Sequence, residues 1–208
     1  MLEIYYAPNT SALAPHIVLE EVGAAYKAIR IDFASSEQQG PDYLRINPKG
    51  RVPALVTASG VLTEVPALLV YLAQAHPAAR LVPFDDPFAF AQLQEFNSFI
   101  CSTLHVAHSH RMRGYRWADD PQAIAAMQRK VPQSVGEAFD LIERHMFRGP
   151  WAMGETYTVV DPYLFTMAQW MESDGVDPQR FPRIQDHRDR MRARPAVQRA
   201  LAREFAVP

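Results

Sequence analysis

The chain has 208 residues, 48% of them hydrophobic, and a formal net charge of -2 at pH 7. This length and this apolar fraction suit one large or two small globular domains with their own cores, and they exclude a disordered chain. A charge so close to zero argues against nucleic acid or an anionic membrane as the main partner, because such partners select proteins with clustered positive charge.

The first residues, MLEIYYAP, lack the basic segment and the apolar core of a secretion signal, and no apolar run in the chain is long enough to span a membrane. Cys101 is the single cysteine, which excludes an intrachain disulfide and is typical of a reducing compartment. We therefore expect a cytoplasmic protein.

The N-terminal segments alternate between strand and helix patterns. Short apolar segments at residues 2–6 and 28–33 flank a helical pattern at about 12–22. This order predicts a strand, helix, strand unit with parallel strands and a right-handed connection.

A hairpin is predicted next along the chain. Residues 54–57 and 61–63 are strand-like, and the residues between them end in Gly60, which suits a tight turn. Apolar residues at positions i, i+3, i+4 and i+7 over 65–72 predict a helix after the hairpin. We therefore expect residues 1–76 to form a small α/β domain with a mixed sheet.

Residues 77–87 are rich in proline and polar residues and predict a linker. Beyond them no strand pattern recurs, and residues 88–208 predict an all-helical domain of five helices, the last two beginning at Pro182 and Pro195. Three of these helices are marked by apolar residues at helical spacing: Leu93, Phe96, Ile100 and Leu104; Val135, Ala138, Phe139, Ile142 and Met146; and Leu164, Met167, Ala168 and Met171.

The segment TYTVVDPYLF, residues 156–165, offers two ways to begin a helix. In one, Thr158 and Asp161 form a capping box. In the other, Asp161 is the N-cap and Pro162 is the first helical residue. Both place the helix start within one turn of Asp161.

Three separated segments carry a resemblance to a known family: NPKGRVPAL at residues 47–55, VLTEVPALLVYL at 61–72 and TVVDPYLF at 158–165. They resemble the glutathione-site and helix-capping motifs of the cytosolic glutathione transferases, and of the bacterial beta class in particular. The resemblance implies the glutathione transferase fold, with an α/β thioredoxin-like N-terminal domain and an all-α C-terminal domain. It also implies glutathione as co-substrate and a homodimer.

The resemblance further implies which residues hold glutathione. The family has a cis peptide bond at the position of Val52 and Pro53, which leaves the Val52 backbone free to pair with a bound peptide, and X-Pro bonds adopt the cis form most readily. Glu64 would begin the next helix, where the backbone favours anions, and would face the ammonium group of the γ-glutamyl end. The family often has serine at the following position; this chain has Val65, of which only the backbone can take part.

The beta class also carries a lysine after the second strand that reaches the glycyl carboxylate. The corresponding segment, FASSEQQG at residues 33–40, contains no lysine. Lys49 and Arg51 are the two candidates to replace it.

The turn APNTSALAPH, residues 7–16, is the candidate site for the thiol of glutathione. The beta class often has cysteine at the position of Ser11, and the absence of cysteine from this turn excludes thiol–disulfide exchange there. A serine hydroxyl can instead donate a hydrogen bond to a thiolate. We rank Ser11 first as the donor, Thr10 second and Tyr6 third, with Asn9 as an orienting group. Ser11 could also simply cap the first helix.

The helix around residue 105 supplies further candidates. The Leu-His pair that ends at His105 resembles the beta class, where the histidine borders the cleft near the sulfur. His105 and His108 are spaced to share a metal, but because no carboxylate is close in sequence we expect no metal site. Cys101 is expected to be a buried core thiol. The residues that follow form either a cationic, aromatic rim favouring an anionic or flat acceptor, or a solvated helix end: Arg111, Arg113, Tyr115, Arg116 and Trp117.

These patterns together predict a glutathione transferase that binds glutathione, stabilises its thiolate and conjugates it to a small hydrophobic electrophile. The missing serine and lysine leave open a binding or regulatory protein of the same fold with little conjugation activity. A glutathione-dependent isomerase, lyase or dehalogenase would share the site and differ in the acceptor pocket.

Overall fold

A mixed four-stranded sheet with strand order β2-β1-β3-β4 forms the N-terminal part of the molecule. The computed structural model describes residues 1–205; residues 206–208, the end of the expected helical domain, lie outside the described residues. The strands are β1 Leu2–Tyr6, β2 Tyr26–Arg30, β3 Ala54–Thr57 and β4 Gly60–Thr63. β2 is parallel to β1, β3 is antiparallel to β1, and β4 is antiparallel to β3. The predicted mixed sheet and its hairpin are confirmed.

Strand β2 begins and ends earlier than the apolar pattern indicates, running from Tyr26 to Arg30 and not over residues 28–33. The chain leaves the sheet soon afterwards, because the side chain of Asp32 accepts the backbone N–H of Ala34 at 2.9 Å. Such a local bond offers the backbone a turn in place of the strand ladder.

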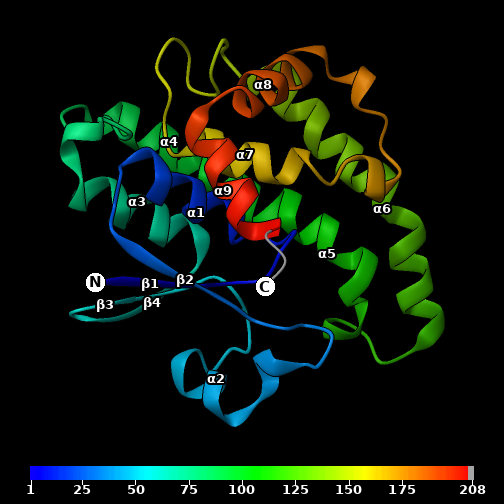
Figure 1. Ribbon diagram of the computed structural model, residues 1–208. Coiled ribbons are helices and arrows are strands. Elements are labelled where there is room, and N and C mark those ends of the chain that lie inside the picture. Colours follow the sequence, from blue (N-terminus) through cyan, green and yellow to red (C-terminus); the bar gives the residue numbers. More distant parts are fainter. Residues whose placement is uncertain (206–208) are drawn as a thin grey trace.

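Helices cover both faces of the sheet (Figure 1). α1 Leu13–Glu21 and α3 Val65–Ala75 pack together on one face, and the short α2 Pro41–Ile46 lies on the other. The apolar spacing of α3 turns Leu68 and Leu72 into the core, where both are fully buried.

The C-terminal part consists of helices. They are α4 Pro87–Phe99, α5 His105–Arg113, α6 Pro121–Leu141, α7 Val160–Ala168, α8 Pro182–Arg192 and α9 Pro195–Phe205. A π-helical segment, Ile100–Leu104, joins α4 to α5, and another, Ile142–Met146, continues α6. Counted as continuous helices, these are the five predicted, with Pro182 and Pro195 beginning the last two. Within residues 1–205, no helix has both the length and the apolar character needed to cross a bilayer.

Short 3-10 turns connect several of these elements. They lie at Glu37–Gln39, Pro77–Ala79, Gly114–Arg116, Glu172–Asp174 and Pro178–Arg180.

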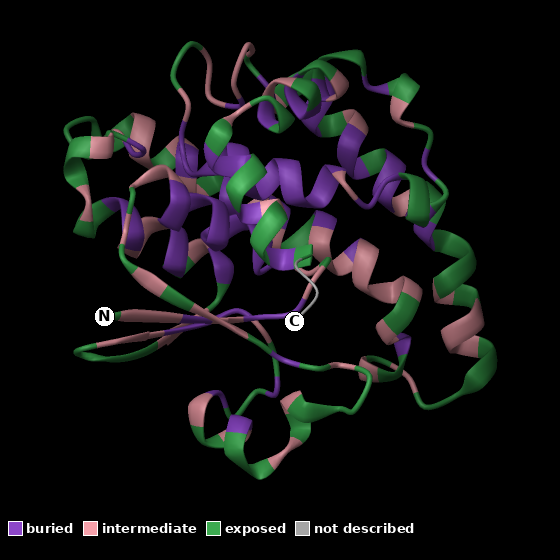
Figure 2. Cartoon of the chain, in the orientation of Figure 1, coloured by how far each residue is buried: buried purple, intermediate pink, exposed green. Residues whose placement is uncertain are grey.

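Two hydrophobic clusters form the core: a large one that runs through the sheet and the helices, and a smaller one where α1 meets α7, α8 and α9. Helix α1 lies near the centre of the core, buried from Leu13 to Glu20, and it contacts α3, α7 and α9 (Figure 2). The core extends from Ile4 in β1 to Phe139 in α6. The turn between β1 and α1 is therefore held between the two parts of the molecule.

The start of α7 shows which capping arrangement the chain adopts. Asp161 Oδ2 accepts the Thr158 N–H at 2.7 Å, and Thr158 Oγ1 accepts the Val160 N–H at 3.3 Å, which is the capping box. Asp161 Oδ1 also accepts the Ala152 N–H at 2.7 Å and lies 3.0 Å from His187 Nε2. The alternative, with Asp161 as the N-cap, is wrong.

Candidate active site

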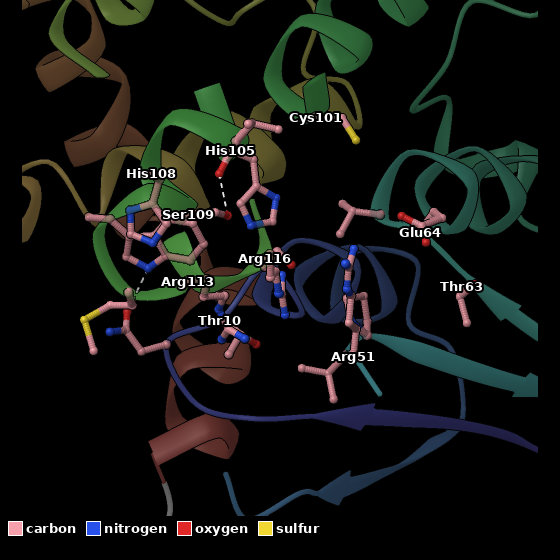
Figure 3. Close-up of a pocket in the computed structure, with 18 of the residues that line it drawn as sticks. Thr10, Arg51, Thr63, Glu64, Cys101, His105, His108, Ser109, Arg113 and Arg116 are labelled. Carbon is pink, nitrogen blue, oxygen red and sulfur yellow. Dashed lines mark hydrogen bonds between the residues drawn. The ribbon is translucent and has the colours of Figure 1, made fainter. Parts of the chain in front are cut away.

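A cleft of about 230 Å³ opens where the sheet meets the helical part (Figure 3). One wall comes from the β1–α1 turn, the loop before β3 and the β4–α3 junction, and the other from the continuous helix α4–α5 with the turn after it, together with Tyr163 and Trp170. The cleft brings together nine of the residues predicted from the sequence: Asn9, Thr10, Ser11, Arg51, Val52, Pro53, Glu64, Val65 and His105.

The two hydroxyls of the β1–α1 turn have different roles. Thr10 Oγ1 donates to the Ala7 carbonyl at 2.7 Å and accepts the Ala12 N–H at 3.3 Å. A hydroxyl has one proton to donate, so the Thr10 proton is already used. Ser11 lines the cleft, and no hydrogen bond among the described residues uses its hydroxyl. Ser11 is thus the free donor, and the prediction that it caps the helix is wrong, because α1 begins without a side-chain cap.

The other candidates from the turn divide between the cleft and the core. Asn9 has a positive φ of 57°, a conformation that asparagine tolerates well, and its Oδ1 accepts the indole N–H of Trp170 at 2.9 Å. Tyr6 is buried away from the cleft, and its hydroxyl donates to the Arg203 carbonyl at 3.3 Å. Its ranking as a thiolate donor is therefore corrected: the hydroxyl faces α9.

The loop before β3 is held by its own side chains. The Val52–Pro53 peptide bond is cis, as the resemblance implies. Tyr43 and Asn47 both donate to the Arg51 carbonyl at 2.6 Å, which anchors the residue before Val52. Within the described residues, no hydrogen bond uses the N–H or C=O of Val52, so both groups remain available to a bound peptide.

Glu64 is the N-cap residue directly before α3 and has a positive φ of 72°. A non-glycine residue held in this region costs of order 1–3 kcal/mol, and such conformations concentrate at binding sites. Lys49 Nζ donates to Glu64 Oε1 at 2.5 Å and to Thr63 Oγ1 at 2.6 Å, and both side chains of the ion pair are substantially exposed. Of the two cationic candidates, Lys49 is therefore held outside the cleft lining and Arg51 projects into it (Figure 3).

His105 enters the cleft from the first turn of α5, directly after the π-helical segment Ile100–Leu104. Burial lowers its pKa to about 4, and the positive charges of His108, Arg113, Arg116 and Arg51 act in the same direction. The imidazole is therefore neutral at neutral pH. The sequence position of His105 predicts that it lies in the cleft. Its charge state depends on these neighbours, which only the structure shows.

Residues 2–74 match the family described as glutathione S-transferase, N-terminal domain, and residues 121–203 match the glutathione S-transferase C-terminal domain. Glutathione S-transferase GstA of Escherichia coli O157:H7 is 31% identical over 98% of this chain and 98% of its own length. The chain belongs to the glutathione S-transferase family.

Solved structures agree with this assignment over the full length. A glutathione transferase homologue from Sulfitobacter with bound glutathione is 42% identical, has a TM-score of 0.96, and covers 99% of each chain. The bacterial beta-class glutathione S-transferase of Sphingomonas chungbukensis is 32% identical with a TM-score of 0.86, covering 99% of this chain and 100% of its own. The predicted resemblance and the transferase fold are confirmed.

Cys101 lines the transferase cleft and is half-buried, so the prediction of a core thiol is wrong. It lies in the π-helical segment directly before His105, a turn that the residue pattern does not predict. Burial raises the pKa of the Cys101 thiol. The thiol is therefore protonated near neutral pH and is a weak nucleophile.

His108 supports the wall of the transferase cleft. Its ring stacks on Trp170 with centroids 4.1 Å apart, and its Nδ1 lies 2.7 Å from Asp174 Oδ2. The centroids of the His105 and His108 rings are 6.4 Å apart. In the part of the chain that the structure describes, no group of three or more His, Cys, Asp or Glu is placed to hold a metal ion.

Tyr163 and Trp170 are among the cleft residues that the sequence does not predict. Tyr163 follows the capping motif of α7, and its burial together with its presence in the cleft lining shows that this motif also positions a cleft side chain. Trp170 lies in the bend after α7 and carries no local signal, because only tertiary packing brings it to Asn9.

Proposed function

We propose that the protein is a glutathione transferase that binds glutathione in this cleft, stabilises its thiolate and joins it to a small electrophile. The observation that carries the proposal is the free hydroxyl of Ser11, which shares one cleft with the unpaired backbone of Val52 and with Glu64. These groups offer a donor for sulfur, a pairing site for a peptide and a carboxylate for an ammonium group.

In this proposal glutathione lies along the wall formed by the sheet side of the cleft. Its peptide backbone pairs with Val52, its ammonium group faces Glu64, and its γ-glutamyl carboxylate lies at the Val65 N–H at the start of α3. We favour Arg51 for the glycyl carboxylate, because Arg51 lines the cleft and Lys49 lies outside its lining.

Thiolate stabilisation depends mainly on the hydroxyl of Ser11. The N–H groups of Ala12, Leu13 and Ala14 already bind Thr10 Oγ1, the Thr10 carbonyl and the Ser11 carbonyl. Lowering a thiol pKa by two units requires about 2.7 kcal/mol. A hydrogen bond to a charged group supplies roughly 1.5–3 kcal/mol, so one free hydroxyl is of the right strength. His105 lines the acceptor side of the cleft. Because its ring is uncharged, it neither repels a cationic acceptor nor forms an ion pair with the thiolate.

The organisation of the chain is part of the proposal. Residues 1–76 would form the glutathione-binding domain, 77–87 the linker and 88–208 the helical domain with the acceptor pocket. We also propose a cytoplasmic homodimer, a state that size-exclusion chromatography with light scattering would establish.

The decisive experiment measures retention on immobilised glutathione and conjugation to a chlorodinitrobenzene for wild type, Ser11→Ala and Ser102→Ala. Ser102 is an exposed helix serine that lies outside the cleft lining, so it is the matched control. We expect Ser11→Ala to be retained but to lose about ten- to a hundredfold in kcat, as one charge-assisted hydrogen bond would give. Ser102→Ala should match wild type.

The other outcomes reject specific parts of the proposal. No retention at millimolar glutathione would reject glutathione binding. Retention without turnover in wild type would indicate a binding protein of the same fold. Unchanged turnover in Ser11→Ala would reject Ser11 as the donor and direct attention to the backbone.

A further inference from the structure

Three guanidinium groups meet in the cleft without a carboxylate to pair with. They belong to Arg51, in the loop before β3, and to Arg113 and Arg116, at the end of α5 and in the turn after it. Among the described residues that line the cleft, Glu64 is the only acid, and its side chain is paired with Lys49. The cleft is therefore strongly cationic, although the chain as a whole is slightly acidic.

The three arginines act on one another and on His105. Burial and the charges of Arg113 and Arg51 lower the pKa of Arg116, and all three arginines contribute to the lowered pKa of His105. Figure 3 shows the side chain of Arg116 between those of Arg113 and Arg51, below His105. Like charges brought this close are unfavourable unless an anion joins them.

Glutathione alone leaves part of this charge unmatched. Of its two carboxylates, one is placed at the start of α3 and the other at Arg51 in the proposed function. Arg113 and Arg116 lie on the opposite, helical wall, where the electrophile would bind. The guanidinium of Arg113 extends from this wall over the ring of Phe33, in the loop after β2, with 5.7 Å between the guanidinium carbon and the ring centroid.

Apolar surface accompanies these two charges. Met112 and Trp117 line the same wall, and both are exposed, at 70% and 49%. Exposed apolar side chains that border unpaired arginines suit a ligand with a flat apolar body and an anionic group.

We propose that the helical wall selects an electrophile that bears a carboxylate on a flat apolar body, with Arg113 and Arg116 binding the carboxylate while Met112 and Trp117 contact the body. This inference rests on the proposed function and narrows its substrate class. Arg113 and Arg116 are then specificity-determining residues. The carboxylate anchors the acceptor so that its electrophilic carbon faces the glutathione sulfur.

The reaction with an aryl chloride shows how the step balances. The glutathione thiol loses its proton to solvent, and the thiolate sulfur attacks the ring carbon that carries chlorine. The carbon–sulfur bond forms, the carbon–chlorine bond breaks, and chloride leaves with the bonding electron pair. The carboxylate elsewhere on the ring is unchanged.

The test compares a chlorodinitrobenzoate with its methyl ester, which has the same reacting carbon but no charge. Each kcat/KM is divided by the uncatalysed rate with glutathione, because the two acceptors differ in intrinsic reactivity. The variants are Arg113→Gln, Arg116→Gln, the double variant and Arg116→Lys. Arg129→Gln is the control, because Arg129 is an exposed arginine on α6 outside the cleft lining.

We expect wild type to prefer the carboxylate by about tenfold or more, as one charge-assisted hydrogen bond would give. The double variant should lose this preference while its KM for glutathione stays unchanged, Arg116→Lys should keep most of it, and Arg129→Gln should match wild type. Raised salt should reduce the preference in wild type. Far-ultraviolet circular dichroism confirms that each variant is folded.

Two results would overturn the inference while leaving the proposed function intact. One is a wild type that turns over the ester as well as the carboxylate. The other is a double variant that loses the same factor with both acceptors, which would mean that the arginines act on the thiolate and not on the acceptor. Failure to conjugate either acceptor, together with no retention on glutathione, would instead reject the proposed function.

Discussion

At the scale of single residues, hydrogen-bond donors decide which group can act on the sulfur. Thr10 and Ser11 are adjacent hydroxyls in one turn, and the chain uses the first to bind the Ala7 carbonyl while leaving the second free. The two side chains are chemically similar, and the backbone geometry of the turn decides that only the Ser11 hydroxyl keeps a free proton. A hydroxyl with a proton free to donate is what a site for a thiolate requires.

His105 gives a prediction for the pH dependence of the reaction. Its pKa is lowered from 6.5 to about 4, so the imidazole is already neutral above about pH 5 and changes charge only in more acidic solution. We expect the rise of kcat/KM with pH to follow the bound thiol alone. In His105→Gln the apparent pKa of that rise should be unchanged, whether or not the maximal kcat/KM changes.

Steady-state rates from about pH 5 to 8 for wild type and His105→Gln test this prediction. A nuclear magnetic resonance titration of the His105 ring would give its pKa directly. An acidic limb in the wild-type profile that disappears in His105→Gln would contradict the assignment of a neutral imidazole.

The sequence predicted much of the site and misplaced some of it, for identifiable reasons. Val52, Pro53 and Glu64 were predicted because local motifs carry their positions. Tyr6 could not be assigned from strand alternation, because either face of β1 is covered and only the packing of α9 shows that its hydroxyl points there. Cys101 was placed in the core because its neighbour Ile100 is apolar, although a helix that borders a cleft is apolar on one side only.

At the scale of elements, α7 depends on a buried carboxylate. Asp161 has no exposed surface, accepts the N–H groups of Ala152 and Thr158, and lies beside His187. Removing the carboxylate leaves several buried polar groups without a partner. Each such group costs about 1–3 kcal/mol, so the total exceeds that of an ordinary helix cap.

We therefore expect Asp161→Ala to lower the free energy of unfolding by about 3–5 kcal/mol. The matched control is Asp86→Ala, because Asp86 caps α4 with bonds to Phe88 and Ala89 but is exposed to solvent. Loss of that cap should cost about 1 kcal/mol. Urea denaturation monitored by circular dichroism measures both, and equal losses would contradict the role given to burial.

The π-helical segment between α4 and α5 is a feature of the fold that apolar spacing in the sequence does not predict. Apolar spacing predicts one long helix through Leu93 and Leu104, and a continuous helix is present. The wider turn at Ile100–Leu104 resets the face on which His105 emerges, and π-helical turns occur often at functional sites. No residue pattern in the segment predicts the π-helical turn, because the turn is stabilised by packing against α6 and α7.

At the scale of the whole molecule, the C-terminal helix supports the turn that carries Ser11. Helix α9 packs along α1, and His16 Nδ1 lies 3.3 Å from Glu204 Oε1 with both side chains fully buried. The backbone N–H of Asn9, next to Thr10 in the turn, lies close enough to the Glu204 carboxylate to counteract the rise that burial causes in its pKa. Residues nearly two hundred positions apart in the sequence are thus joined directly behind the cleft.

This arrangement predicts that Glu204→Ala lowers activity as well as stability. The change leaves His16 Nδ1 without its partner and removes the carboxylate beside the Asn9 N–H, so the turn loses one of its supports and the Ser11 hydroxyl is less well placed. We expect the free energy of unfolding to fall by about 2–4 kcal/mol. We also expect kcat for conjugation to fall by about tenfold at temperatures where the variant remains folded, since small displacements of the proposed thiolate donor are costly.

Arg199→Ala is the matched control, because Arg199 also joins α9 to α1, through Glu20, but its side chain is half-exposed and is not linked to the turn. Glu20 keeps Arg203 and Tyr26 as partners in this variant, and the half-exposed Arg199 contributes about 0–1 kcal/mol, so both stability and activity should be retained. Glu204→Gln keeps a polar carbonyl group beside His16 and the turn and should recover part of the lost kcat. A Glu204→Ala protein that is less stable but fully active when folded would show that α9 supports only the fold, and the link from the C-terminal helix to the catalytic turn would have to be abandoned.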